Sequence, residues 1–436
     1  MHGQKALTRN IFTLAWPAVA TNITTPLLSL VDVAVVGHIG NSVYIGAIAV
    51  GATMFNTLYW LFGFLRMGTS GMTAQAYGAG DTASAVKILK RSLLVAIVAA
   101  IMLIVLSTSL GALIIDFIDA DGASRIPARE YFEIAILGAP GVLVTYALSG
   151  WFLGMQDSRP ILWMALVTNC LNIVLNLTFV FALHWQLAGV ASATAISQWA
   201  GAVFGIIILC RNKKRLMGSV NKQAHAIKRQ SLSMLRFIRV NSDIFLRTLC
   251  LIAVTIWFTH AGARLGSETL AANALIMQLF MLFSYFMDGF AFAGEAMAGK
   301  YKGADNDKDL RALIRTLMRI GVYISAIITI IYFAASDYIM ALLTDDADTL
   351  AVAHGYRLWA VAVPFAGFMS FLWDGIFIGL TKTRGMLAAM AVAMAVFYLA
   401  YFALTPLLGN HALWLAFIIY LFVRGLVQWL IFSFKR

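Results

Sequence analysis

The stretch Leu387–Leu408 reads LAAMAVAMAVFYLAYFALTPLL and contains no charged side chain. A helix of this length and composition crosses the roughly 30 Å of hydrocarbon in a bilayer, which takes about 20 apolar residues. The runs Leu93–Leu106, with its flanks, and Ile161–Leu183 have the same character. The stretch therefore predicts a membrane-spanning helix, and its recurrence predicts an all-α polytopic membrane protein.

The composition of the whole chain agrees with this prediction. Of its 436 residues, 61% are hydrophobic and 12% are charged, and the mean hydropathy is +0.83. A soluble domain carries about twice this share of charge. The apolar runs between polar breaks predict about twelve helices, over residues 11–38, 43–68, 88–110, 131–154, 160–183, 188–210, 240–262, 269–298, 312–335, 351–379, 386–408 and 411–434.

The net charge of +12 lies mainly in short loops between these runs. Such placement sets the topology of membrane proteins, so we expect a lipid bilayer around the chain and no nucleic-acid partner. The most basic loop is Arg211–Arg236, and basic loops alternate with loops that lack Lys and Arg. Both termini are therefore expected to face the cytoplasm. The first ten residues show no pattern of a cleavable signal peptide.

The motifs of enzymes are missing from the sequence. It has no phosphate-binding Gly-Lys-Ser/Thr loop, so ATP is not expected to be the direct energy source. No group of His and Cys has metal-ligand spacing. The three cysteines, Cys170, Cys210 and Cys250, lie in or beside apolar runs and imply no disulfide framework. We expect no enzymatic activity, no cofactor and no metal.

The chain repeats itself with an offset of about 225 residues. The segment Gly154–Arg159 (GMQDSR) returns as Gly379–Arg384 (GLTKTR), and 379 − 154 = 225. Tyr77–Ala79 (YGA) matches Lys302–Ala304 (KGA) at the same offset. Because six helices per half is an even number, the halves share one orientation in the membrane. We expect two parallel six-helix lobes, an N-lobe over residues 1–210 and a C-lobe over 237–436, joined by a basic cytoplasmic loop over 211–236.

Polar side chains inside the apolar helices are the candidates for function, because a charge at the bilayer centre costs at least about 2.5 kcal/mol. Asp32 stands in the first expected helix with no cation within a helical turn. Loss of hydration favours its protonated form, so Asp32 is a candidate proton carrier; a structural, hydrogen-bonded acid is the alternative. In the same helix Pro17 and Pro26 each remove a backbone hydrogen bond and are candidate hinges, with a static bend as the alternative.

Amide side chains follow one face of the fifth expected helix. Asn169, Asn172 and Asn176 lie at i, i+3 and i+7. Three amides are costly against lipid, so we expect them to face protein or a wet cavity. Thr194 and Gln198 give the sixth helix a similar polar edge. A transport pathway and interhelical packing are both open as the role of these residues.

The second half holds its own buried charges. Asp243 and Arg247 are spaced i, i+4 and are expected to pair with each other. Asp288 and Glu295 share a helix face at i, i+7, and Asp374 lies near the inner end of the tenth expected helix. These three acids are candidates for a second site in the C-lobe. Structural pairing with nearby Lys or Arg is the alternative.

The segments that carry these residues resemble the multidrug and toxic compound extrusion (MATE) family, in its DinF-like branch. The resemblance covers essentially the whole chain, and it is carried by the motifs Asn22–His38, Phe64–Ala79, Asn172–Asn176, Asp288–Ala296 and Trp373–Gly379. It implies a twelve-helix antiporter of the bacterial inner membrane, monomeric, that exports bulky and often cationic drugs in exchange for H⁺ or Na⁺.

The resemblance also assigns roles to single residues. Asp32 corresponds to the family's essential first-helix carboxylate, and Pro17 corresponds to its bending proline. The polar network around that carboxylate corresponds to Asn172 and Thr194. Many DinF-like members carry Asp at the position of Asn176. With one acid fewer, the N-lobe site favours H⁺ over Na⁺, since sodium prefers several anionic oxygens whereas a proton needs one. Any second proton carrier is expected among the three C-lobe acids, and Asp374 is favoured.

A flippase for lipid-linked oligosaccharides is the alternative function. Such a transporter would need a cationic cavity that holds a pyrophosphate group. The charges inside the expected helices are chiefly acidic, and Arg66, Arg247 and Arg424 are scattered along the sequence. We therefore favour drug export.

Overall fold

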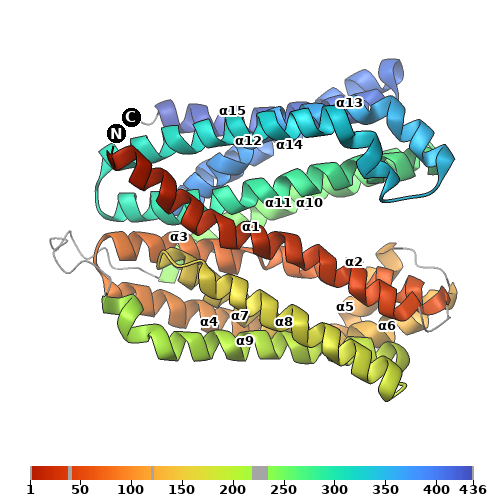
Figure 1. Cartoon of the computed structure of the whole chain (residues 1–436), viewed down its shortest axis with the longest axis horizontal. Helices are drawn as coiled ribbons and strands as arrows, with labels where there is room; N and C mark the ends of the chain where they lie inside the picture. Colours follow the sequence, from red (N-terminus) through yellow and green to blue (C-terminus); the bar gives the residue numbers. More distant parts are fainter. Residues whose placement is uncertain (1, 38–41, 119–121, 219–233, 435–436) are drawn as a thin grey trace. The chain divides into compact units, whose positions relative to one another are not determined.

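The computed structural model describes residues 2–37, 42–118, 122–218 and 234–434. Nearly all of these residues are helical, which confirms the all-α prediction (Figure 1). The helices of the described residues are α1 (His2–Gly37), α2 (Ser42–Leu61), α3 (Phe64–Gly78), α4 (Thr82–Val105), α5 (Ser107–Ile118), α6 (Gly122–Ala135), α7 (Ala139–Gly154), α8 (Arg159–Leu177), α9 (Gln186–Gly218), α10 (Met234–Ala263), α11 (Ser267–Gly303), α12 (Asp307–Ala341), α13 (Ala347–Gly379), α14 (Thr383–Leu408) and α15 (Asn410–Phe434).

Eleven helical stretches among the described residues are long and apolar enough to cross a membrane. Two of them combine consecutive helices, α2 with α3 and α6 with α7. The helix α1, which is 36 residues long, adds a further element of spanning length. These elements match the predicted polytopic architecture of about twelve spans.

Several helices begin earlier than the apolar pattern predicts, because polar caps extend them. Asp81 precedes α4, and its carboxylate accepts the backbone N–H of Ser84 at 2.9 Å. Asn306 precedes α12, and its side-chain oxygen accepts the N–H of Asp309 at 3.0 Å. Such caps satisfy backbone groups that the first turn leaves open. The predicted starts at 88 and 312 were late because these first turns are polar.

The backbone confirms the predicted 225-residue offset at its turns. A positive φ is unusual for residues other than glycine, so its recurrence at matched positions is specific. Three pairs of positive-φ residues are each 225 positions apart, namely Gly80 (73°) and Asp305 (50°), Gln156 (66°) and Thr381 (50°), and His184 (54°) and Gly409 (53°). The two halves therefore share one backbone plan.

Glycines in the two halves make equivalent close contacts. A Cβ at Gly150 of α7 would lie 2.3 Å from the carbonyl oxygen of Arg66 in α3. A Cβ at Gly375 of α13 would lie 2.2 Å from the carbonyl oxygen of Ala291 in α11. Gly150 and Gly375 are 225 positions apart, and so are Arg66 and Ala291. In each half the absent side chain allows two helix backbones to pack directly.

Replacing Gly375 by Ala should therefore lower the stability of the protein by about 1–3 kcal/mol, because the clash involves backbone atoms that cannot rotate away. Gly355→Ala is the matched control, since Gly355 lies in the same helix and a Cβ there meets nothing within 4 Å. Melting temperatures in detergent measure both variants. Equal melting temperatures would contradict the close packing of α13 on α11.

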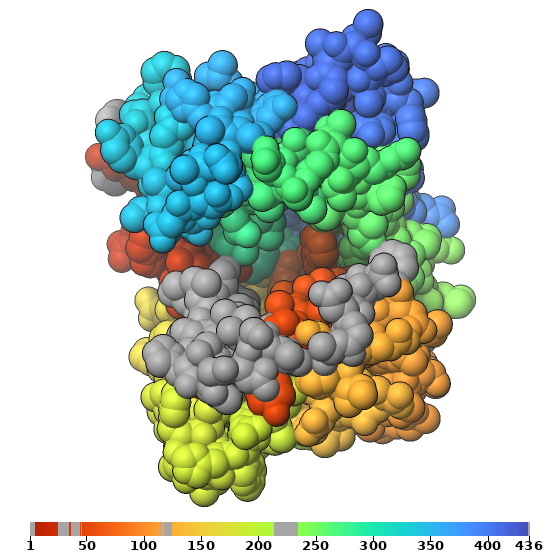
Figure 2. Space-filling view, turned by 90° about the vertical axis from the view of Figure 1, so that its right-hand side faces the viewer, coloured from red at the N-terminus to blue at the C-terminus, as the bar shows by residue number. Residues whose placement is uncertain are grey.

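The described helices form two compact units. Unit 1 consists of residues 1–19, 233–302 and 306–436, and unit 2 consists of residues 20–232 and 303–305. The beginning of α1 and the end of α15 lie at one end of unit 1 (Figure 1). The connections α10–α11, α12–α13 and α14–α15 gather at the opposite end, in green, cyan and blue in Figure 2. The predicted cytoplasmic orientation of the termini stays a prediction.

The helix α1 contributes to both units, since its residues up to Val19 belong to unit 1 and those from Ala20 to unit 2. Within unit 1, the rings of Phe12 in α1 and Phe290 in α11 meet edge to face at 5.4 Å. A Cβ at Gly289 would lie 3.0 Å from the carbonyl oxygen of Ala15. The predicted lobe boundaries (1–210, 211–236 and 237–436) stay a prediction, and residues 219–233 of the linker loop lie outside the described residues.

Candidate functional site

The first-helix candidates lie in α1. Asp32 and Pro26 are part of the helix, but their side chains lie outside the described residues. Their predicted roles stay predictions. Pro17 is half-buried and lies two residues before Val19, the last residue of α1 in unit 1. A proline that weakens a helix at this point is positioned where the helix passes from one unit to the other.

A chain of buried polar groups joins α8 and α9 in unit 2. The amide of Asn176 donates to the side-chain oxygen of Asn172 at 2.9 Å, and the amide of Asn172 donates to the hydroxyl of Thr194 at 3.3 Å. The Thr194 hydroxyl donates in turn to the carbonyl of Val190 at 3.0 Å. Asn172 and Asn176 are both 0% exposed, as expected for amides that must avoid lipid. The structure thus brings together the three residues of the predicted polar network.

The same face of α8 contacts α1. The amide of Asn169 donates to the backbone carbonyl of Thr24 at 3.4 Å. Asn169, Asn172 and Asn176 therefore mark one side of α8 that faces neighbouring helices of unit 2, as the i, i+3, i+7 spacing predicts. Gln198 is half-buried, one turn after Thr194 on α9.

The predicted pair between Asp243 and Arg247 is wrong. Asp243 instead accepts a hydrogen bond from the Thr383 hydroxyl at 2.7 Å, and Arg247 forms an ion pair with Asp374. The two side chains lie on one helix, α10, but point to different neighbours, α14 and α13. The i, i+4 rule applies to solvent-exposed helices, whereas packing against other helices decides the partner of a buried side chain.

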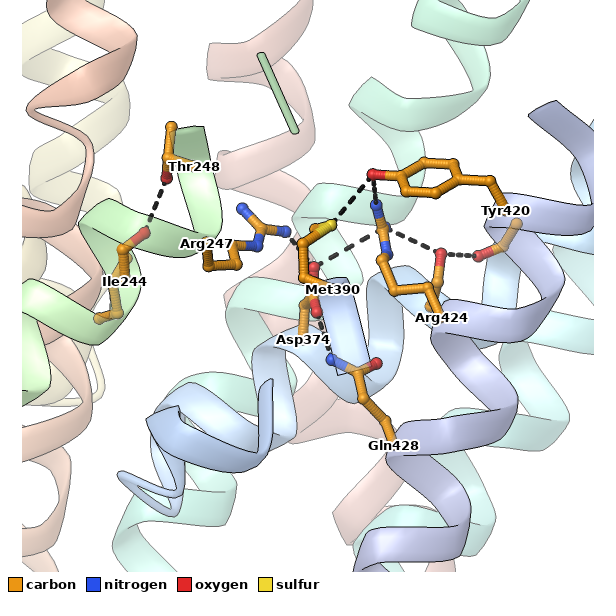
Figure 3. A network of polar contacts seen from close by, with 10 residues as sticks. Ile244, Arg247, Thr248, Asp374, Met390, Tyr420, Arg424 and Gln428 are labelled. Carbon is orange, nitrogen blue, oxygen red and sulfur yellow. Dashed lines mark hydrogen bonds and ion pairs between the residues drawn. The ribbon is translucent and has the colours of Figure 1, made fainter. Parts of the chain in front are cut away.

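Buried charges from three helices meet at Asp374 in unit 1 (Figure 3). One carboxylate oxygen, Oδ2, pairs with Arg247 of α10 and lies 3.7 Å from Arg424 of α15. The other, Oδ1, accepts the amide of Gln428 at 2.5 Å. Asp374 and Arg247 are 7% exposed and Arg424 is 3% exposed. Arg247 and Arg424, which the sequence presents as scattered, thus converge on one acid.

Arg424 has further partners of its own. Its guanidinium donates to the hydroxyl of Ser370 at 2.9 Å and to that of Tyr420 at 3.4 Å. It also lies over the rings of Phe371 and Tyr420, 5.4 and 5.7 Å from their centroids. We call Arg247, Asp374, Arg424 and Gln428 the unit 1 ionic cluster.

The two other acids predicted in the C-lobe lie on α11, where Asp288 is half-buried. Glu295 is buried on α11, seven residues after Asp288. The contacts of Gln428 with Asp374 and of Tyr420 with Arg424 were not predicted from the sequence. The signal that could have found them is the spacing of Tyr420, Arg424 and Gln428, which are four residues apart in an otherwise apolar helix.

The two units differ at their polar centres although their backbones match. At the 225-residue offset, Asn172 and Asn176 correspond to the buried aromatic residues Phe397 and Tyr401, which stack at 6.5 Å. Asp374 corresponds to Ser149. Unit 2 therefore has a neutral amide network, and unit 1 has an ionic cluster at a different place. Among the described residues, no group of three or more His, Cys, Asp or Glu could hold a metal ion.

Comparisons with known proteins give one consistent family. The MatE family model matches residues 17–178 and 244–403. The two matched segments start 227 residues apart (244 − 17) and end 225 apart (403 − 178), close to the internal offset. DNA damage-inducible protein F of Escherichia coli (strain K12) is 39% identical over 413 residues, which are 95% of this chain and 89% of that protein. A probable multidrug resistance protein NorM of Thermotoga maritima is 22% identical over 354 residues, 79% of this chain and 74% of that protein.

Solved structures show the same fold. A crystal structure of MATE in the bent conformation superposes with a TM-score of 0.87 at 18% identity, and the match covers 100% of this chain and 97% of that one. The bent form of the Vibrio cholerae MATE transporter VcmN superposes with a TM-score of 0.84 at 17% identity, covering 99% and 98% of the two chains. At this level of identity the likeness concerns the fold.

Proposed function

The chain belongs to the MATE family of transporters, and on that basis we propose that it exports bulky, often cationic drugs from the bacterial cytoplasm in exchange for H⁺. The family model and the 39% identical relative confirm the resemblance found in the sequence. Members of this family are multi-pass membrane transporters rather than enzymes. The proposal adds the coupling ion, the substrates, the inner-membrane location, the cytoplasmic termini and a monomeric state.

The observation that carries the proposal is the buried chain of hydrogen bonds from Asn176 through Asn172 to Thr194. Side-chain amides and hydroxyls both donate and accept, so they can serve a neighbouring carboxyl group in either protonation state. A network of neutral groups of this kind supports reversible protonation better than a fixed cation would. A fixed cation would hold the acid ionised.

The contact between Asn169 and Thr24 sets the register of α8 against α1. Three spans separate the two helices, so they cross the membrane in the same direction. Asp32 follows Thr24 by eight residues, and Asn176 follows Asn169 by seven. At 1.5 Å per residue the two backbones advance about 12 and 10.5 Å, so they reach similar heights. This register supports Asp32 as the proton carrier that the amide network serves.

We further propose a single proton carrier per cycle. Protonating Asp374 would leave two buried guanidinium groups facing one negative charge fewer, which is costly in a low dielectric. Asp374 is therefore a poorer second carrier than the sequence indicates. Asp32 remains the carboxylate of the N-lobe site, and one acid suits H⁺ better than Na⁺. Pro17 is proposed as the hinge of α1, whereas Pro26, Asp288 and Glu295 keep the open roles that the sequence gives them.

The flippase alternative receives no support from the arginines. Arg247 and Arg424 do lie together, and a pyrophosphate site would need such a pair. However, both are buried and already face Asp374. Asp374 therefore already occupies the place between the two guanidinium groups that a pyrophosphate would need.

Inverted membrane vesicles test the proposed function through the energy source. With an acidic lumen, ethidium should accumulate in the vesicles, because each pH unit supplies about 1.4 kcal/mol per proton, or roughly tenfold accumulation. A Na⁺ gradient without a pH gradient should drive no accumulation. A membrane potential alone should also have no effect, since one H⁺ exchanged for one monovalent cation moves no net charge.

Vesicles that lack the protein are the control for passive dye uptake. Accumulation driven by the Na⁺ gradient would replace H⁺ with Na⁺ in the proposal. Accumulation driven by the potential alone would show that more than one proton enters per cycle.

A further inference from the structure

The ionic cluster of unit 1 leaves no oxygen of its central carboxylate open. Oδ2 of Asp374 pairs with Arg247 and faces Arg424, while Oδ1 accepts the amide of Gln428 (Figure 3). All three partners are donors, and two of them are permanent cations. A mobile cation would therefore have to displace one of these groups before it could reach Asp374.

The two arginines differ in how strongly they depend on Asp374. Arg424 is also held by Ser370 and Tyr420 and by the ring of Phe371. Among the described residues, the Arg247 side chain has one ion pair, with Asp374. The buried Nε atom of Arg247 has no hydrogen-bond partner among these residues. Removing the Arg424 side chain would therefore remove several contacts at once. Removing the Arg247 side chain would remove mainly the positive charge beside Asp374.

Arg247 provides the ion pair at Oδ2 of the buried Asp374. Without Arg247 this buried oxygen would lose its ion pair, and its nearest cation would be Arg424 at 3.7 Å, which Ser370 and Tyr420 hold in place. Oδ2 of Asp374 would then be open to a small cation. Carboxylate oxygens are suitable ligands for a small hard cation.

We propose that Arg247 is a resident counter-cation, which occupies the place at Asp374 that a mobile monovalent cation would otherwise take. Arg247 then determines ion specificity, because its presence keeps Na⁺ and H⁺ out of unit 1. The inference concerns cation binding to unit 1 and goes beyond the proposed exchange at unit 2. Its test can therefore be read without any transport assay.

The test replaces Arg247 by Met, which keeps much of the side-chain volume and removes the charge. In purified protein, the melting temperature of Arg247→Met should rise by several degrees when choline chloride is replaced by NaCl, or when the pH is lowered. The wild type should show neither response. Arg239→Met is the matched control, because Arg239 lies on the same helix, is exposed and carries the same charge. It should behave as the wild type.

A double variant links the response to the acid. In Arg247→Met/Asp374→Asn the cation dependence should disappear, because the amide carries no charge to neutralise. Arg247→Lys should also show no cation response, because it keeps a cation at the site.

Three results would overturn the proposal. The first is a folded Arg247→Met whose stability is the same in choline and NaCl and at both pH values. The second is a cation response that survives the Asp374→Asn exchange. The third is failure of both Arg247→Met and Arg247→Gln to fold even in high NaCl and at low pH, because a mobile cation then cannot replace the guanidinium. Because the test measures thermal stability, its outcome does not depend on whether the protein exports drugs in exchange for protons.

Discussion

Replacing Asp32 by Asn should abolish drug export while the protein still folds and reaches the membrane. An amide is neutral and costs less than a carboxylate in a helix surrounded by hydrocarbon, so folding should stay near that of the wild type. The amide cannot take up and release a proton, so the exchange cycle has no counter-ion. Ethidium accumulation in inverted vesicles with an acidic lumen should fall to the level of vesicles without the protein.

Asp157→Asn provides the control for this experiment. Asp157 lies in the turn before α8, where its carboxylate accepts the backbone N–H of Arg159 at 3.2 Å, outside the amide network. This variant should transport normally. Export at the wild-type rate by Asp32→Asn would rule out Asp32 as the proton carrier. The hydrogen-bonded network of Asn172, Asn176 and Thr194 would then have to act on a different carboxyl group.

Replacing Asp374 by Ala should have the largest effect on stability. Arg247 and Arg424 would keep their buried charges and lose the carboxylate between them. Removing one partner of a buried ion pair typically costs about 3–5 kcal/mol, because the remaining charge stays uncompensated. We expect a large fall in melting temperature in detergent and a reduced yield of folded protein.

An exposed ion pair of the same unit gives the matched control. Arg357 and Asp337 also pair, but their side chains are 38% and 43% exposed. Exposed pairs contribute about 0–1 kcal/mol, so Asp337→Ala should change the melting temperature little. Combining Asp374→Ala with Arg247→Met should recover part of the lost stability, since it removes one uncompensated charge. Equal melting temperatures for Asp374→Ala and Asp337→Ala would show that the cluster does not stabilise unit 1.

The spans and the repeat could be predicted from the sequence because both depend on local features. A run such as Leu387–Leu408 has one physical explanation in a chain of this composition. The repeat was visible from a few matched glycines and turn residues, and the positive-φ pairs at the 225-residue offset confirm it. The face of α8 was also predictable, since the i, i+3, i+7 spacing of its asparagines fixes their direction on a helix.

The partners of the buried charges could not be predicted in the same way. Arg247 has an acid four residues away, but it pairs with one 127 positions later in the sequence. The partners of these side chains depend on how α10, α13, α14 and α15 pack together. A single sequence contains no direct record of that packing. The same reason explains why Gln428 was not predicted as a partner of Asp374.

The division of α1 between the two units has a consequence for how the chain could be cut. A break in the loop between α9 and α10 would separate the two repeats in sequence. It would nevertheless leave residues 1–19, which pack in unit 1, on the fragment that builds unit 2. The first helix is thus an exchanged arm, comparable to the swapped segment of a domain-swapped dimer. Fragments divided at that loop should therefore complement each other only when the arm is present on one of them.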